Sequence, residues 1–298
     1  MPCYISKQTT VYEPRRTNHV VRATNLDSMN ATEPVPSVPP VAVELRAATK
    51  TYANGLRALD SIDLQVVSGE FATLLGPSGC GKSTLLRMVA RLSSPTSGGV
   101  ALWPAQRDAV TSGASAPQHL AYVFQAPTLM PWASVERNVS LPLMLARYDA
   151  EQAAVRVRTA LALVGLDEFR TLYPRQLSGG MQMRVSIARA LVTDPSLLLM
   201  DEPFGALDEI TRARLDQEIR DLWARRSLTV LFVTHSIHEA VFLSTRVLVM
   251  SARPGRILGE IAIDEPHPRT DAFRLSERFA ALCHRVSTLL QHGSGAQP

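Results

Sequence analysis

The chain has 298 residues, of which 46% are hydrophobic and 19% are charged, and this composition suits one large packed domain or two small ones. The formal net charge is only +4 and charges of both signs are interspersed, so the composition does not indicate a nucleic-acid groove. Cys3, Cys80 and Cys283 form no C-x-x-C pair, which suits a reducing cytosol. No apolar run is long enough to cross a bilayer and no secretory signal is visible, so any membrane connection is expected through a partner.

The N-terminal segment lacks hydrophobic periodicity and ends in the proline cluster EPVPSVPP. Such a composition predicts a disordered tail and linker over residues 1–40. A start of translation at Met29 is an alternative interpretation of the same residues, and we assign the tail no function.

Three strands are expected before the first helix. Val41–Arg46 and Leu59–Val67 alternate in strand fashion, and Thr49–Gly55 between them is predicted to be a turn. The third strand, Phe71–Leu75, is largely apolar and suits a buried position. Tyr52, in the turn, has two interpretations that stay open here: core packing at a strand end, or a ring that stacks on a nucleotide base.

The segment after the third strand fits the phosphate-binding motif G-x-x-x-x-G-K-[ST] over Gly76–Ser83 and continues into a helical pattern over Thr84–Leu92. Its glycines let backbone N–H groups converge at a helix N-terminus, where they favour an anion. Lys82 is one of only three lysines in the chain, which indicates that a compact ammonium is needed there. It would reach the β- and γ-phosphates, and the Ser83 hydroxyl would ligate Mg²⁺. The residues of this loop expected to bind ATP are Gly76, Pro77, Ser78, Gly79, Cys80, Gly81, Lys82, Ser83 and Thr84.

One cysteine, Cys80, lies inside this loop beside Lys82 and a helix N-terminus. These neighbours are expected to lower the pKa of the thiol. We therefore expect ATP to protect the protein against inhibition by a maleimide.

The rest of the chain alternates between predicted strands and helices. After a turn at SSPTSGG, strands are expected at Val100–Trp103, His119–Phe124, Leu197–Met200, Thr229–Val233, Arg246–Met250 and Ile257–Ile263. Helices are expected at Val135–Arg147, Glu151–Leu163, Met181–Val192, Leu207–Trp223, Ile237–Leu243 and Phe273–Leu290. Alternation of this kind predicts an α/β sheet whose parallel part is buried, with functional residues at the carboxyl ends of its strands.

Polar residues follow three of these strands: Gln125, the pair Asp201-Glu202, and His235. A carboxylate pair at the end of an apolar strand is unusual, because burying a charge without a partner costs several kcal/mol. Asp201 would hold Mg²⁺ through water, and Glu202 would orient or deprotonate the attacking water. The alternative interpretation of this pair is a helix N-cap.

Five motifs stand in the order found in the ATP-binding subunits of ABC transporters, and the chain resembles that family over about residues 41–263. The motifs are GPSGCGKST at Gly76–Thr84, Gln125, LSGGM at Leu177–Met181, DEPFGALD at Asp201–Asp208, and His235. The resemblance implies an α/β fold of the phosphate-loop NTPase (ABC ATPase) type, with a mixed β-sheet core, an antiparallel β subdomain and an α-helical insertion at about 126–192. It also implies a C-terminal helix and tail over 264–298.

The same resemblance implies a role for each matching residue. Tyr52 stacks on adenine, and Gln125 contacts Mg²⁺ and the lytic water. Glu202 is the catalytic carboxylate, His235 contacts the γ-phosphate, and Asp208 belongs to a loop that crosses a dimer interface. The implied catalytic set is Glu202, His235, Gln125 and Lys82, and the implied Mg²⁺ set is Ser83, Gln125 and Asp201.

The turn formed by Ser178, Gly179 and Gly180 opens a predicted helix, so its hydroxyl and N–H groups form a second anion site. In the family this turn caps the ATP held by the opposite subunit, which implies a head-to-tail homodimer with two ATP molecules between the copies. Met181 stands where the family's usual pattern has glutamine, a departure that leaves the serine and glycine donors in place.

A finer resemblance is to importer ATPases for nitrate, sulfonates and taurine. It rests on the segments Met130–Val139, Gly179–Leu191, Asp201–Arg212 and Arg253–Ile261. It implies uptake of a small anionic or organic solute, with permease subunits and an extracytoplasmic solute-binding protein as partners. It also implies a peripheral position on the cytoplasmic face of the inner membrane. Trp132 is either an interface anchor for the permease or part of the core of the helical insertion.

Two other classes of function compete with this one. A soluble ABC-type ATPase acting on DNA or ribosomes would carry a long coiled-coil insertion, a zinc module or a second ATPase unit. The sequence has no sustained heptads, no C-x-x-C pair and one phosphate loop. A small-molecule kinase would not need the LSGG turn. We therefore expect no nucleic-acid partner, and co-purified nucleic acid would favour the first of these alternatives.

Overall fold

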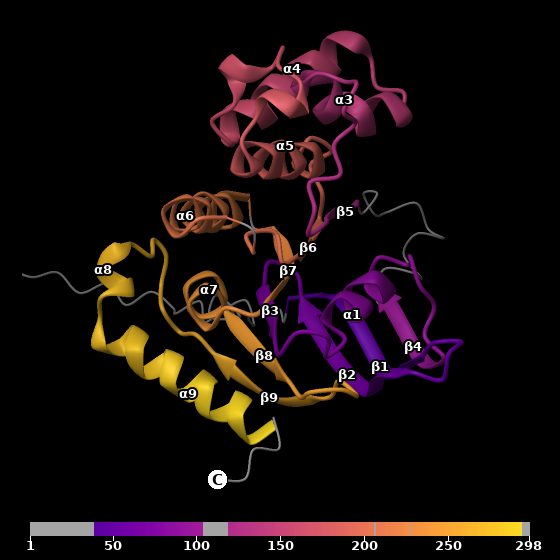
Figure 1. The fold of residues 1–298 in the computed structure, drawn as a ribbon, viewed down its shortest axis with the longest axis vertical. Helices are drawn as coiled ribbons and strands as arrows, with labels where there is room; N and C mark the ends of the chain where they lie inside the picture. The colour runs from indigo at the N-terminus through magenta and orange to yellow at the C-terminus, as the bar shows by residue number, and fades with distance from the viewer. Residues whose placement is uncertain (1–38, 104–118, 206, 227, 294–298) are drawn as a thin grey trace, which may run out of the picture. The chain divides into compact units, whose positions relative to one another are not determined.

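The computed structural model describes residues 39–103, 119–205, 207–226 and 228–293. The tail predicted over 1–40 falls outside the described residues except for its last two positions. The described part of the chain contains two β-sheets and the helices that pack on them (Figure 1).

The larger sheet has six strands in the order β5-β6-β7-β3-β8-β9. Its strands are β3 (Phe71–Leu75), β5 (Leu120–Val123), β6 (Leu197–Asp201), β7 (Thr229–Thr234), β8 (Arg246–Met250) and β9 (Ile257–Ala262). The first five strands in this order pair in parallel, and β9 pairs antiparallel to β8. This mixed sheet confirms the predicted α/β class and brings the carboxyl ends of β3, β6 and β7 to one edge.

Alternate residues of the central strands face opposite hydrophobic cores. In β3, Phe71 and Leu75 belong to one buried cluster, and Ala72 and Leu74 belong to the other. The strands β6 and β7 divide their side chains in the same way. Because successive strand residues point to opposite faces, a strand covered on both faces must be apolar throughout, and this is the pattern that predicted these strands.

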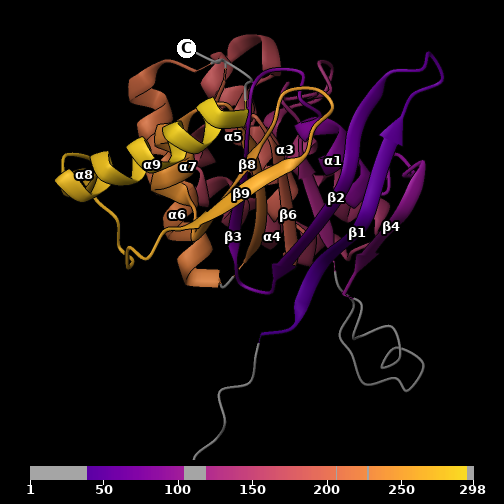
Figure 2. The ribbon, with the colours of Figure 1, turned by 90° about the horizontal axis from the view of Figure 1, so that it is seen from below.

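The smaller sheet is antiparallel in the order β2-β1-β4, and Figure 2 shows its strands side by side. It consists of β1 (Val41–Thr51), β2 (Arg57–Val67) and β4 (Ser97–Leu102). Both β1 and β4 extend into segments that we expected to be turns. The extension follows from cross-strand pairing, since Thr49 pairs with Ser97 and their hydroxyl oxygens are 2.7 Å apart.

Helices cover the sheets and form the insertion between β5 and β6. The elements are α1 (Lys82–Val89), α3 (Val135–Leu145), α4 (Ala150–Leu163), α5 (Gly179–Leu191), α6 (Glu209–Arg226) and α7 (Ile237–Leu243). α3, α4 and α5 pack on one another and form one group in Figure 1. Side-chain oxygens of Ser134, Asp149, Ser178 and Ser236 cap the starts of α3, α4, α5 and α7. Among the described residues, no helix combines the length and apolar character needed to cross a membrane.

The C-terminal segment differs from the single helix expected over Phe273–Leu290. It forms two helices, α8 (Asp271–Arg274) and α9 (Glu277–Gly293). Ser276 separates them, because its hydroxyl donates to the Phe273 carbonyl at 2.7 Å and accepts from the N–H three residues later at 3.1 Å. A serine that satisfies a carbonyl of one helix and an N–H of the next ends the first and caps the second. α9 then packs along α7, β8 and β9.

Candidate active site

The loop between β3 and α1 carries the phosphate-binding motif. Gly81 caps α1 with a φ of 107°, and a Cβ at this position would lie 2.8 Å from the Ala58 carbonyl oxygen, so only glycine fits. Lys82 is 4% exposed, and its Nζ donates to the carbonyls of Gly76 at 2.8 Å and Pro77 at 3.1 Å. The ammonium therefore lies at the loop beside the backbone N–H groups of the first turn of α1, an arrangement that attracts phosphate oxygens.

The Ser83 hydroxyl and the Asp201 carboxylate, both possible metal ligands, meet at the junction of α1 and β6. The Ser83 hydroxyl donates to Asp201 Oδ1 at 2.7 Å, and the hydroxyl of Tyr122, on β5, donates to Asp201 Oδ2 at 3.1 Å. Burial, and then the nearby Asp201 carboxylate, raise the pKa of Tyr122 well above its ordinary value. A hydroxyl and a carboxylate at this spacing fit Mg²⁺, which takes one or two protein oxygens and completes its shell with phosphate oxygens and water. Sequence reasoning did not identify Tyr122.

The Glu202 carboxylate lies between two functional groups. Its Oε1 is 3.4 Å from Lys82 Nζ, and its Oε2 is 3.1 Å from Nδ1 of His235, at the end of β7. Glu202 has a φ of 45°, in the left-handed region that residues with a Cβ rarely adopt. Such backbone strain is found where a site fixes the direction of a side chain. The three residues predicted to be catalytic from the ends of β3, β6 and β7 are thus brought together.

A cavity of about 170 Å³ opens beside this cluster and is lined by Tyr52, Lys82, Ser83, Thr84, Glu202 and Arg253, among others. Tyr52 is 38% exposed, and its hydroxyl is 2.9 Å from the hydroxyl of Thr84. The ring therefore lies at the rim of the cavity and not in the core, which favours the second interpretation of Tyr52. Arg253 was not predicted, because it reaches the cavity from the turn between β8 and β9.

Gln125, Ser178 and Asp208, which were predicted to be site residues, lie outside the lining of this cavity. Gln125 is exposed in the turn that follows β5. Ser178 caps α5 by accepting from the Met181 N–H at 3.3 Å, and Asp208 accepts from the Thr211 N–H at 2.9 Å at the start of α6. The Thr211 hydrogen bond holds the pKa of the exposed Asp208 carboxyl below its ordinary value. The structure of one chain therefore does not bring the LSGG turn to its own phosphate loop.

The predicted lowering of the pKa of the Cys80 thiol is wrong. The side chain is 1% exposed, and burial raises the pKa of the thiol above its ordinary value. Lys82 and the N–H groups of the loop act in the opposite direction, as predicted, but their effect is smaller than the cost of placing a thiolate in the core.

Behind His235 lies a buried polar network that the sequence analysis missed. The Thr234 hydroxyl donates to the Glu239 carboxylate and accepts from the Ser236 N–H at 3.0 Å. Glu239 Oε1 also lies 3.3 Å from Nε of Arg212, on α6. The one signal available was an acidic residue, Glu239, within the apolar pattern of α7, but its partners are remote in sequence.

The network continues through α6 to the C-terminal segment. Asp216 is 1% exposed, and its Oδ2 accepts from Nη2 of Arg274, on α8, at 2.9 Å. Burial, with the nearby Glu239 carboxylate, raises the pKa of Asp216 to about 7. α6, α7 and α8 are thus joined by buried charges directly behind the strand end that carries His235.

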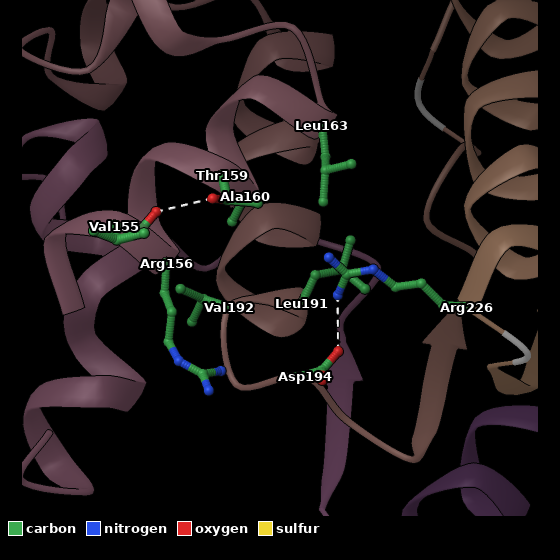
Figure 3. Close-up of a pocket in the computed structure, with 9 residues that line it drawn as sticks. All are labelled: Val155, Arg156, Thr159, Ala160, Leu163, Leu191, Val192, Asp194 and Arg226. Carbon is green, nitrogen blue, oxygen red and sulfur yellow. Dashed lines mark hydrogen bonds and ion pairs between the residues drawn. The ribbon is translucent and has the colours of Figure 1, made fainter. Parts of the chain in front are cut away.

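A second concavity, of about 370 Å³, lies between α4, the end of α5 and the end of α6 (Figure 3). Arg226 and Asp194 close one side of it with an ion pair of 2.8 Å, and Arg156 projects from α4 on the other side. No predicted site residue lines it.

Comparison with known proteins gives the family. A family model described as ABC transporter matches residues 59–205. A putative ATP-binding protein of Brucella abortus is 43% identical over 238 residues, which are 80% of this chain and 89% of that protein. An uncharacterized ABC transporter ATP-binding protein of Methanocaldococcus jannaschii is 46% identical over 254 residues, covering 84% of this chain and 92% of the relative. An aliphatic sulfonates import ATP-binding protein of Bacillus cereus is 38% identical over 256 residues, covering 85% and 97%.

Solved structures agree with this result. A dimeric ATP-binding cassette in a post-hydrolysis state with ADP and Pi matches with a TM-score of 0.64 and 34% identity, over 75% of this chain and 100% of that chain. A subunit of an ABC transporter complex from Clostridium perfringens matches with a TM-score of 0.67 over 85% of this chain, and at 24% identity it supports the fold alone.

The fold and the site thus define a phosphate-loop ATPase with an antiparallel β subdomain and a helical insertion. The chain belongs to the ABC transporter family, and the resemblance seen in its motifs is confirmed. It is the ATP-binding subunit of a transporter and hydrolyses ATP.

Proposed function

We propose that this subunit energises import of a small anionic or organic solute, and that the cavity lined by Lys82 and Glu202 holds ATP. The observation that carries the proposal is the Glu202 carboxylate held between Lys82 and His235 beside that cavity. The relative named for import of aliphatic sulfonates supports a sulfonate as the solute, and nitrate and taurine are proposed from the motif resemblance alone.

The chemistry follows from the positions of the side chains. Lys82 and the N–H groups of its loop bind the β- and γ-phosphates, and Tyr52 stacks on adenine. Glu202 orients the attacking water and accepts its proton, because its carboxylate lines the cavity and its contact with His235 fixes its direction. His235, 3.1 Å from Glu202, holds that carboxylate and reaches the γ-phosphate. These steps need the water and the γ-phosphate in line, which makes positioning the main contribution of the protein.

Mg²⁺, when bound, neutralises charge on the β- and γ-phosphate oxygens. Ser83 and Asp201, whose oxygens are 2.7 Å apart, would hold it, and Tyr122 fixes the second oxygen of Asp201. We assign Gln125 as a further ligand that follows β5 and links the site to the insertion.

A second copy of the chain would complete the site. Ser178, Gly179 and Gly180 present a hydroxyl and free N–H groups at the start of α5, away from their own phosphate loop. Gly180 lies against Leu207 and Thr211, so the LSGG turn and the loop that carries Asp208 form one surface. We infer that this surface caps the ATP of the partner copy in a head-to-tail homodimer, and the dimeric cassette with 34% identity supports this arrangement.

The helical insertion offers a docking surface for a permease. Trp132 is 76% exposed, which favours an interface anchor over insertion core. The loop that carries Trp132 is fixed by the fully buried Asn138. The Asn138 side-chain NH₂ donates to the carbonyls of Met130 at 3.2 Å and Ala133 at 3.0 Å, and its side-chain oxygen accepts from the Met130 N–H at 2.7 Å. The subunit would then be peripheral on the cytoplasmic face of the inner membrane, with a solute-binding protein joining from the other side.

The test is purification of the tagged chain from detergent-solubilised membranes, followed by mass spectrometry and solute uptake in proteoliposomes. We expect a multispanning membrane protein in the eluate and ATP-driven accumulation of an alkanesulfonate, nitrate or taurine. Glu202→Gln should reduce ATP turnover by at least about 100-fold, while Glu277→Gln, at an exposed residue of α9, should not. An eluate that carries nucleic acid or ribosomal proteins and no membrane protein would exclude the importer.

A further inference from the structure

The turn between β8 and β9 is fastened to the phosphate loop. Its backbone closes on itself, with the Ser251 N–H donating to the Arg256 carbonyl at 2.9 Å. Gly255 joins the turn to β2, because its N–H donates to Ala58 at 2.9 Å and its carbonyl accepts from the Asp60 N–H at 3.0 Å. A Cβ on Gly255 would collide with the carbonyl oxygen of residue 80 in the phosphate loop, so glycine is required for this close approach.

Two arginines project from this turn, and their partners differ. Arg256 forms an ion pair with the buried Asp60, through Nε at 2.7 Å and through Nη2. Arg253 donates from Nε at 3.1 Å and from Nη2 at 2.9 Å to the carbonyl oxygen of Gly79 in the phosphate loop. Across the ranges that the structure describes, Arg253 has no carboxylate within ion-pair distance. Within those ranges its guanidinium is therefore hydrogen-bonded to a neutral carbonyl and has no compensating negative charge.

The Arg253 side chain also lines the cavity that holds Tyr52, Lys82 and Thr84. Its hydrogen bonds to Gly79 engage Nε and Nη2, and among the described residues Nη1 makes no hydrogen bond, so this nitrogen is available to an anion bound in the cavity. A guanidinium forms bidentate, charge-assisted hydrogen bonds to phosphate, and these are stronger than bonds to a neutral acceptor. The exposed Arg253 guanidinium, which has no carboxylate partner among the described residues, lines a cavity proposed to hold a nucleotide. It is therefore placed to bind the negatively charged phosphates.

We propose that Arg253 is a nucleotide-binding residue that contacts the α- or β-phosphate of bound ATP and ADP. The cavity that Arg253 lines also contains Tyr52, on which adenine is proposed to stack, and Lys82, which is proposed to bind the β- and γ-phosphates. This assignment rests on the proposed function of the cavity as the nucleotide site. It adds to the loop a contact from a turn that lies more than 170 residues further along the chain.

The experiment measures the Kd of ATP, ADP and adenosine for the full chain by isothermal titration calorimetry at low salt. Arg253→Gln keeps a hydrogen-bond donor for the Gly79 carbonyl and removes the charge. It should raise the Kd of ATP and of ADP by about five- to tenfold each and leave the Kd of adenosine unchanged. Arg253→Lys, which keeps a charge, should bind ADP more tightly than Arg253→Gln does. Arg256→Gln alters the same turn without touching the cavity and should bind as the wild type does.

Each outcome separates a phosphate contact from a supporting role in the loop. Equal losses in Arg253→Gln and Arg253→Lys, or a loss for ATP with none for ADP, would overturn the proposal. Lys82→Ala is the reference variant: if it binds nucleotide as tightly as the wild type, the cavity itself is misassigned. If Lys82→Ala loses binding while Arg253→Gln retains wild-type affinity for ATP and ADP, only the role of Arg253 is refuted.

Discussion

The Asp216 carboxyl provides a quantitative test of the buried network behind His235. It is 1% exposed, and its Oδ1 has no hydrogen-bond partner in the described part of the chain. Burial and Glu239 raise its pKa from 3.8 to about 7, although Arg274 and Arg212 lower it. The folded state therefore holds this proton more tightly than the unfolded chain does.

The sign of the pH dependence follows from the raised pKa. The stability contributed by protonated Asp216 is fully present below about pH 4 and is lost as the pH rises through about 7. Between pH 5 and pH 8 the loss covers about two pKa units at about 1.4 kcal/mol each, or about 3 kcal/mol. Asp216→Asn has the shape of the protonated carboxyl and no proton to lose. The excess of its free energy of unfolding over that of the wild type should therefore grow by about 3 kcal/mol between pH 5 and pH 8.

Urea unfolding followed by circular dichroism at pH 5, 6, 7 and 8 measures this difference. Asp221→Asn is the matched control, because Asp221 lies on the same helix, is half-exposed and accepts from Gln217 at 2.9 Å. Its free energy of unfolding should follow the pH dependence of the wild type. If the curves of Asp216→Asn and the wild type run parallel from pH 5 to pH 8, the Asp216 carboxyl is ionised throughout and the reasoning is refuted.

Three further predictions concern the loop and the core. Lys82→Ala should weaken ATP binding by at least about tenfold, measured with a fluorescent ATP analogue, since a charged hydrogen bond contributes about 1.5–3 kcal/mol; unchanged affinity contradicts the loop assignment. Cys80 should react slowly with a maleimide at pH 7 whether or not Mg·ATP is present, and rapid labelling followed by mass spectrometry would show that the thiol is not buried. Arg269→Met should cost at least about 3 kcal/mol in urea unfolding, because its buried guanidinium donates to five backbone carbonyls, and a cost below 1 kcal/mol would contradict this.

Local pattern was sufficient to predict the central strands and the residues at their ends. Phe71–Leu75 and Leu197–Met200 are largely apolar because both faces are covered, and the polar residues that follow them lie at the carboxyl edge of the sheet. The phosphate loop was predictable because its glycines and Lys82 act within a few residues of one another. Such features depend on neighbours in sequence.

Features that depend on distant partners were not predictable. Arg253 approaches Gly79 across 174 positions, and the Tyr122 hydroxyl reaches Asp201 across 79. The pKa of Cys80 was predicted in the wrong direction because the sequence shows its charged neighbours and not its burial. The C-terminal segment was predicted to be a single helix because its apolar periodicity continues through Ser276. The hydrogen bonds of the Ser276 hydroxyl interrupt the helix at that residue.

The central claim is that each ATP is closed in by two copies of the chain, with Lys82 on one side and Ser178–Gly180 of the partner copy on the other. Sedimentation of the Glu202→Gln variant, with bound nucleotide counted in the same sample, tests it most directly. With ATP, the Glu202→Gln variant should sediment as a dimer that holds two ATP molecules, and with ADP it should sediment as a monomer. The double variant Glu202→Gln with Ser178→Arg should remain a monomer in the presence of ATP. A monomer that holds one tightly bound ATP, and that Ser178→Arg leaves unaltered, would contradict it.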